Sequence, residues 1–451
     1  MSTEIKVEMN DKLIQPDRTL APPVHPFPPV DMPEVRRLRL DNGVPLHVID
    51  RCGSEVCRIS FIRDGGMEEA TRPTVATLMS DMLCEGTASY DGAALTDSLE
   101  FNGAWFNGIA YKHHTAAVMY ALNNRFADVM PLLGSMATEA SFPDDRFMAM
   151  RERAISNAAV RLRQVKYRSL QAIRRMVYGV SHPIARTDTP DIIAALEVED
   201  LRRFYGAGFI DSSTGIYLSG RITPEMEDEV NRRFGTIEVS QASTLVDRRP
   251  MAPCDNRIDT VQIDGSMQGG VKIAIPTIGP SHPDYWDLSL AVTALGGYFG
   301  SRLMLNIREE KGYTYGIQSF LAGSGSEGLM TVASEADNSY VVPLIQETLA
   351  EIARLAVEPV DDEEMNRMRN YVISQAVATL DSPFNMMNYY ETLRFDALPA
   401  DSFRRRMDAV NNITARRIAE VAAKYMHPED VRIAVAGDID AYPVDENIIF
   451  H

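Results

Sequence analysis

An internal repeat at a spacing of 217 residues constrains the fold of this chain more than any other feature. Residues 216–222 and residues 433–439 each have the pattern of an apolar strand that ends at a glycine turn. Each strand follows a segment with the apolar spacing of a helix, and these two segments align at the same offset. A third pair, residues 74–83 and 291–300, also aligns at 217. Three separated matches at one offset predict two copies of one folding unit.

The repeat divides the chain into four parts. Residues 1–33 form an arm whose last twelve positions hold six prolines, a density that favours extended backbone and excludes a helix. The first domain is predicted at residues 34–240 and the second at residues 256–451, with a polar, proline-containing linker at 241–255 between them.

Each domain is predicted to have an α+β fold. Asn42-Gly43 stands between two alternating runs, which is a strong hairpin signal. Long helical patterns cover residues 144–166 and 361–380. Hairpins combined with such helices predict, in each domain, a roughly six-stranded, mainly antiparallel or mixed sheet with helices packed on one face.

Composition excludes several classes of function. The 451 residues carry a formal net charge of −18, which argues against a nucleic-acid binder and against a polybasic membrane-surface protein. Four cysteines without a Cys-x-x-Cys pair do not form a disulfide framework. We find no apolar run near the roughly 20 residues needed to span a bilayer, and no signal-peptide pattern at the first residues. We therefore expect a cytoplasmic protein with no nucleic-acid or membrane partner.

The helix expected after Gly65-Gly66 carries the most specific motif. Its apolar stripe faces the core, whereas Thr77, Ser80, Asp81 and Cys84 form a small polar seam. Gly-Gly-x-x-Glu followed by a helix that ends in Met-Leu-x-x-Gly-Thr resembles the insulinase, pitrilysin and mitochondrial processing peptidase family of zinc peptidases. That family carries an inverted motif, His-x-x-Glu-His, on this helix, with two zinc ligands and a general base. The resemblance covers about residues 34–440 and implies two similar α+β domains, of the kind shared by LuxS and the processing peptidases.

The sequence departs from this motif at every position. Thr77 and Asp81 stand where the histidines would be, Ser80 stands at the glutamate, and Ala159 is the best placement for a distal glutamate ligand. A hydroxyl does not replace the base, and one aspartate does not make a three-ligand site. We therefore expect no metal and no cofactor in this chain, and zinc in a catalytic partner subunit.

A second stretch keeps the residues of the family. Residues 301–315 resemble its second-domain motif, in which an arginine and a tyrosine seven residues apart hold the substrate backbone and stabilise the oxyanion. Arg308 and Tyr315 match those positions. The alternative is that Arg308 pairs with nearby acids and that Tyr315 packs on a helix.

Residues 102–108 resemble the first-domain strand whose edge pairs with extended peptide in the family, and such pairing does not need the metal. The peptide-binding strand would use Ala104, Trp105, Phe106 and Asn107, although a core strand with an aromatic anchor explains them equally well. The adjacent His113 and His114 would point to opposite faces of a strand, which disfavours a shared metal ion.

Three functional hypotheses follow. The leading one is a non-catalytic subunit of a zinc-dependent peptidase, which contributes Arg308, Tyr315 and chamber wall to the site of a homologous partner that carries the zinc motif. The second is a homodimeric, catalytically inactive peptide-binding or scaffold protein. The third is an active hydrolase with a remodelled site. In the first case part of the −18 charge would line the chamber and attract basic peptides.

Overall fold

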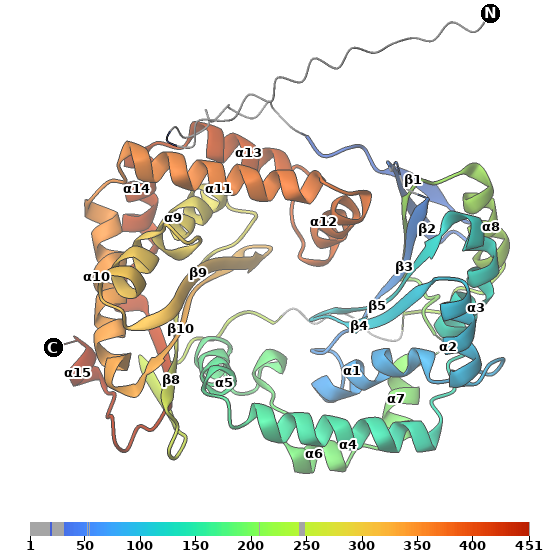
Figure 1. The fold of residues 1–451 in the computed structure, drawn as a ribbon, viewed down its shortest axis with the longest axis horizontal. Coiled ribbons are helices and arrows are strands. Elements are labelled where there is room, and N and C mark those ends of the chain that lie inside the picture. The colour runs from blue at the N-terminus through green and yellow to red at the C-terminus, as the bar shows by residue number, and fades with distance from the viewer. Residues whose placement is uncertain are drawn as a thin grey trace, which may run out of the picture. The chain divides into compact units, whose positions relative to one another are not determined.

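A computed structural model describes residue 19 and residues 31–51, 53, 55–206, 208–242 and 249–450 (Figure 1). Most of the proline-rich arm and the centre of the expected linker lie outside the described residues. The division into two domains stays a prediction. The α+β class with two sheets is confirmed.

The first sheet has six strands in the order β1-β2-β6-β3-β5-β4. Only β2 and β6 pair in parallel. The strands are β1 (Arg36–Arg39), β2 (Pro45–Asp50), β3 (Val56–Asp64), β4 (Trp105–Ala110), β5 (His114–Leu122) and β6 (Gly215–Gly220). The expected hairpin joins β1 to β2, and Gly43 has a φ of 88° in its turn, a conformation that favours glycine.

The second sheet has five strands in the order β7-β11-β8-β10-β9. They are β7 (Ile258–Gln262), β8 (Gln268–Ile278), β9 (Thr314–Ser324), β10 (Glu327–Asp337) and β11 (Arg432–Gly437). Its parallel pair, β7 and β11, corresponds to β2 and β6 of the first sheet. The repeat in the sequence is therefore a repeat of topology, in which the second copy has no counterpart of β1 among the described residues.

The helices of the first half lie between residues 73 and 234. They are α1 (Pro73–Asp81), η1 (Met82–Cys84), α2 (Gly92–Phe101), η2 (Asn123–Arg125), α3 (Phe126–Thr138), α4 (Asp144–Arg161), α5 (Val165–Tyr178), η3 (Pro183–Ala185), α6 (Pro190–Ala194), α7 (Val198–Tyr205) and α8 (Pro224–Phe234). The pattern at residues 144–166 thus divides into α4 and the start of α5, with Gln164 between them.

The helices of the second half include one π-helical segment, η4 (Met304–Glu310). The others are α9 (Tyr285–Gly296), η5 (Asn338–Tyr340), α10 (Val341–Val357), α11 (Asp362–Leu380), α12 (Pro383–Phe395), α13 (Ser402–Asn412), α14 (Ala415–Tyr425), η6 (Pro428–Asp430) and α15 (Glu446–Phe450). The helix expected at residues 361–380 is α11.

The single offset of 217 is wrong for the first part of each copy. It holds for the closing helix and strand, since α7 begins at Val198 and α14 at Ala415. In the sheets, however, Ile59 pairs with Leu218 in the first copy, and Val271 pairs with Val435 in the second. Ile59 and Val271 are therefore equivalent positions, and they are 212 residues apart. α1 and α9 also begin 212 residues apart. Apolar residues recur every three to four positions on a helix, so a few matched ones do not fix the register.

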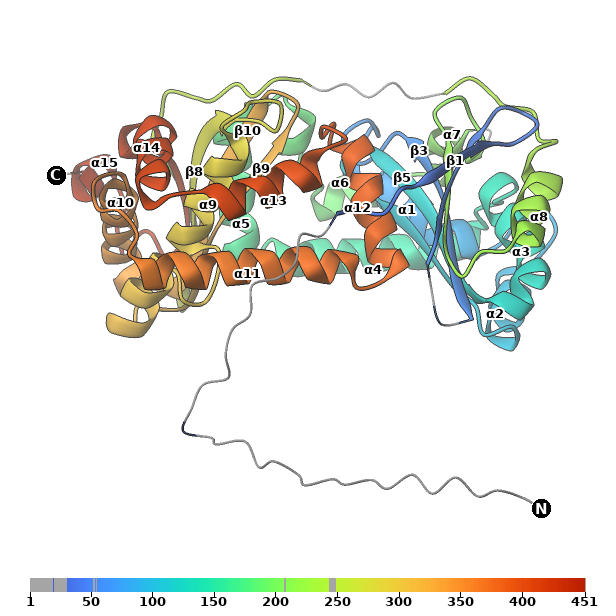
Figure 2. The same ribbon diagram turned by 90° about the horizontal axis from the view of Figure 1, so that it is seen from above.

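Each sheet receives one helix from the other half of the chain. α5 packs on β8 and β11 of the second sheet, and α12 packs on β2 and β6 of the first. Figures 1 and 2 both show α5 beside the second sheet, and Figure 2 shows α11 leading into α12. The expectation that helices cover one face is therefore incomplete, because the opposite face of each sheet also carries a helix.

Apolar side chains explain this exchange. On α5, Ala172, Ile173, Met176 and Val177 pack against strand alanines such as Ala434. On the first sheet a second apolar face, which includes Ile62 and Val118, is covered by residues of α12. A central strand that is apolar on both faces needs cover on both faces, because exposed apolar area costs about 25 cal/mol per Å².

Candidate functional site

Two polar residues of the expected motif on α1 line a cavity of about 400 Å³. Thr77 and Asp81 line it one helical turn apart, as residues at i and i+4 do. Burial raises the pKa of the Asp81 carboxyl, and the charge of Arg153 acts in the opposite direction. Thr77 and Asp81, two of the positions that depart from the zinc motif, therefore line the same cavity.

Ser80 is not part of that cavity. The residue is fully buried, and its hydroxyl has no hydrogen-bond partner in the described structure. Its backbone oxygen lies so close to β4 that a Cβ on Gly108 would be 1.9 Å from it. Ser80 is therefore buried where α1 closely approaches β4, and it does not line the cavity.

α4 faces the cavity with residues other than the expected one. Arg153, Ala154 and Asn157 line it, and Ala159 does not. Because 153 and 157 are one turn apart, both lie on the face toward α1, whereas Ala159 is about 200° around the helix from Asn157. The placement of the lost ligand at Ala159 therefore does not match the face of α4 that meets the cavity.

This donor set does not fit zinc. The cavity offers threonine hydroxyls, an amide and three carboxylates, those of Glu68, Asp81 and Asp188, but no histidine or cysteine, and its lysine and arginine side chains carry charge that opposes a dication. Across the described residues, no three histidine, cysteine or acidic side chains come close enough to form a metal cluster. We therefore derive no chemical step through a metal in this chain.

Hydrogen bonds made by Arg186 and Asp188 hold the loop before α1 and the first turn of α1. Arg186 donates to the carbonyl oxygens of Ala70 at 2.7 Å and Thr71 at 3.1 Å. Asp188 accepts the backbone N–H of Thr74 in the first turn of α1, at 2.8 Å. The helix is thus held in place although its motif is degenerate.

Arg308 and Tyr315 line a second, larger cavity of about 920 Å³. Tyr315 is 93% exposed, so it does not pack on a helix as the alternative supposed. Arg308 pairs with the neighbouring Glu309 and lies 4.6 Å over the Phe299 ring, while still lining the cavity. Both cavities include Arg174, so they adjoin within one chain.

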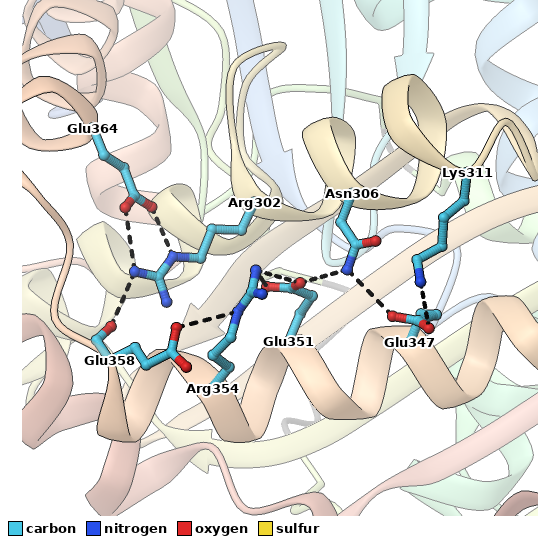
Figure 3. A network of polar contacts seen from close by, with 8 residues as sticks. All are labelled: Arg302, Asn306, Lys311, Glu347, Glu351, Arg354, Glu358 and Glu364. Carbon is cyan, nitrogen blue, oxygen red and sulfur yellow. Dashed lines mark hydrogen bonds and ion pairs between the residues drawn. The ribbon is translucent and has the colours of Figure 1, made fainter.

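A polar network holds η4, the segment that carries Arg308 (Figure 3). Asn306 donates to Glu351 at 2.5 Å, and Lys311 pairs with Glu347 at 2.7 Å, both on α10. Before η4, Arg302 forms a two-bond ion pair with Glu364, at 2.9 and 3.2 Å. π-helical segments are rare and occur frequently at functional sites. The Ser-Arg-Leu part of the motif therefore positions the segment that presents Arg308.

The expected peptide-binding strand lies at a sheet edge. β4 pairs with β5 only, among the described residues, and contains Trp105, Phe106 and Asn107, with Ala104 just before it. Trp105 is 57% exposed, whereas Phe106 packs partly against the core. The strand therefore has a free backbone edge and an apolar anchor, and its role in peptide binding stays a prediction.

The adjacent histidines have separate partners. His113 Nδ1 lies 2.7 Å from Glu69 Oε1, and the His114 ring stacks on Phe395 of α12 at 4.0 Å. They do not form a shared site.

The larger cavity carries a charge that the sequence patterns do not predict. Its lining includes four cations and a single acid, Glu335; the cations are Lys166, Arg174, Lys272 and Arg308. The expectation that negative charge lines the chamber is therefore wrong for this cavity. One signal was available, because Lys272 is the only charged residue of the apolar strand β8, and lysine is almost never buried without a partner.

No helix in the described part of the chain is both long enough and apolar enough to cross a bilayer.

Comparison with known proteins agrees with this geometry. Residues 195–372 match the family model described as the peptidase M16 inactive domain. The chain is 19% identical to an uncharacterized zinc protease of Bacillus subtilis over 70% of this chain and 76% of that protein. It is 22% identical to the mitochondrial-processing peptidase subunit beta of Mus musculus, over 95% and 89% of the two chains. It is also 22% identical to cytochrome b-c1 complex subunit 1 of Bos taurus, over 91% and 88%.

Among solved structures, a peptidase M16 inactive domain from Pseudomonas fluorescens superposes with a TM-score of 0.79 and 20% identity. The match covers 89% of this chain and 98% of that one, and it shows the fold.

Proposed function

We propose that this chain is a non-catalytic subunit of a zinc-dependent peptidase, since its residues 195–372 match the peptidase M16 inactive domain and the chain is similar to an uncharacterized zinc protease and to a processing-peptidase beta subunit. A homologous partner subunit supplies the zinc site. This chain supplies Arg308, Tyr315 and part of the wall around the bound peptide. Its location is the cytoplasm, as the sequence analysis expects.

One observation carries the proposal. The cavity of α1 has a guanidinium, Arg153, beside Thr77 and Asp81, while Arg308 and Tyr315 remain together in the adjoining cavity. The half of the machinery that binds metal is lost, and the half that holds substrate is kept and braced by buried polar contacts. Two relatives are named as subunits of larger assemblies, which supports a role beside a partner.

The chemistry of the retained pair fits substrate binding. A guanidinium and a phenol are donors at neutral pH, so both can hold a peptide carbonyl or an oxyanion without a proton transfer. With Tyr315 93% exposed, its hydroxyl is accessible to a peptide.

Purification from the native cell tests the proposal. We expect the chain to co-purify with a homologue that carries an intact zinc motif. Metal analysis should find zinc in the complex and less than about 0.1 zinc per isolated chain, and a chelator should abolish peptide hydrolysis by the complex. Zinc near one per isolated chain, lost in Asp81→Ala, would contradict the proposal.

Variants of Arg308 and Tyr315 distinguish a substrate-binding subunit from an inactive scaffold protein. Arg308→Ala and Tyr315→Phe should each lower kcat/KM of the complex about 10²-fold, as the loss of an oxyanion donor does. The control is Tyr442→Phe, which removes a hydroxyl from another exposed tyrosine that does not line the cavity. Unchanged kcat/KM in both site variants would favour the inactive scaffold.

A further inference from the structure

Lys272 stands alone in the wall of the larger cavity. The residue is 6% exposed, on the central strand β8, and the described structure gives its amine no hydrogen bond or ion pair. In register with it are Ala434 on β11 and Ala333 on β10. Because cross-strand neighbours share a face, alanines on both sides leave space around the amine and offer no counter-charge.

Other cations surround the same space. Lys166 and Arg174 approach from α5, and Arg308 from η4. The only acid in the lining, Glu335, is 3.9 Å from Lys166, and that pair is largely exposed, so it contributes little. Burial and the charge of Lys166 lower the pKa of Lys272, and the charge of Glu335 acts in the opposite direction. A buried cation without a hydrogen-bonded counter-ion is stabilised by a ligand that brings a carboxylate to it.

This local charge opposes that of the whole chain. The cavity has four cations to one acid, in a protein of net charge −18. Apolar side chains, among them Leu170, Ile173 and Leu329, complete the wall. The occupant therefore needs carboxylate groups together with apolar parts.

We propose that this cavity binds a peptide carboxylate, with Lys272 as the buried specificity residue, so that the chain selects acidic segments. The inference rests on the proposed peptide-binding function and gives it a substrate class. Lys166, Arg174 and Arg308 strengthen the same preference from the rim.

Fluorescence anisotropy with the full chain tests this inference. Three nine-residue peptides, acetylated, amidated and labelled, differ only in three central positions that are Glu, Gln or Lys. We expect the Glu peptide to bind about tenfold tighter than the Gln peptide, the size of one charged hydrogen bond, and the Lys peptide to bind most weakly. The Gln peptide with a free C-terminus separates a terminal carboxylate from a side-chain one.

Lys272→Met keeps the apolar stem and removes the charge. The preference for Glu over Gln should then fall below about threefold, while binding of the Gln peptide stays within about twofold. The matched control is Lys424→Met, which removes the same charge from an exposed lysine that pairs with Asp284 outside the cavity.

The outcomes are distinct. Equal binding of the Glu and Gln peptides by the unaltered chain, tighter binding of the Lys peptide, or a Glu preference that survives Lys272→Met would overturn the inference and leave the proposed function intact. The comparison in the unaltered chain stands even if the variant does not fold. Failure to bind any peptide would overturn both.

Discussion

At the scale of residues, one buried ion pair links the two halves of the sequence. Arg58 on β3 is 3% exposed and forms two hydrogen bonds with Glu391 on α12, at 2.8 and 3.1 Å. Ser60 donates to the same carboxylate at 3.0 Å. A buried pair joined by two hydrogen bonds costs much more to break than an exposed one.

Glu391→Ala should therefore lower the free energy of unfolding by about 3–5 kcal/mol, since it leaves Arg58 buried and unpaired. Urea denaturation measures the change. Glu420→Ala is the matched control, because it removes an exposed carboxylate paired with Arg416, and it should cost less than about 0.5 kcal/mol. Similar losses in the two variants would show that the pair does not stabilise the fold.

His47 gives a pH dependence at the same contact. Its ring stacks on Tyr217 at 4.8 Å and lies 3.0 Å from the Tyr390 hydroxyl. Burial, with the positive charges of Arg394 and Arg37, lowers its pKa to about 4 from 6.5. Between these values the unfolded chain binds a proton that the folded chain does not, so stability rises with pH across this window.

Acidification from pH 6.5 to pH 4 should therefore cost about 1–2 kcal/mol through His47, less than the full shift implies because the ring is partly exposed. His47→Gln should remove this part of the slope in denaturation curves recorded at both pH values. The same change at the exposed His427 serves as control. An identical slope in His47→Gln and the parent would refute the assignment.

At the scale of elements, η4 depends on α10. Glu351, 1% exposed, accepts a hydrogen bond from Asn306 and also pairs with Arg354 at 2.7 Å (Figure 3). π-helical segments are rare, so we expect these bonds from α10 to help hold η4 in this conformation.

Glu351→Ala should loosen η4, although the Arg308 side chain itself is unchanged. We expect faster amide exchange at residues 304–310, and a drop of about tenfold in the affinity for the acidic peptide. Glu363→Ala on α11 is the control, because it breaks only an exposed pair with Arg367. Unchanged exchange at residues 304–310 would mean that other contacts hold the segment.

At the scale of the whole molecule, exchanged helices make the two sheets depend on each other. α5 covers β8 and β11, while α12 covers β2 and β6, so each half alone would expose an apolar sheet face. If one half unfolds, it exposes the apolar sheet face of the other half, so we expect both halves to unfold in one cooperative transition.

Residues 34–240 and residues 256–450, produced separately, should therefore each lack a sharp thermal transition in near-ultraviolet circular dichroism. When mixed, they should recover one. Full chain cleaved within 243–248 is the control, since it keeps both helices and should melt in one step. Independent, sharp melting of either half would contradict the exchange as a source of stability.

The sequence predicted the parts of this protein that depend on neighbours along the chain. The hairpin at Gly43 and the two-copy topology follow from spacing and residue type, whereas the absence of zinc at Thr77 and Asp81 stays a prediction. The register of the first part of the repeat did not, because apolar helix patterns match at several offsets.

Only the tertiary structure decided which side chains meet. Arg153 opposite Asp81, Lys272 between two alanines, and α12 on the first sheet all join segments far apart in sequence. Such contacts depend on how one element packs against another, and the residue type at a single position does not predict this packing. The sequence by itself therefore determined that Thr77, Ser80 and Asp81 do not match a zinc motif, whereas the tertiary structure decided that the cavity around Lys272 is positively charged, because only folding brings those four cations to one space.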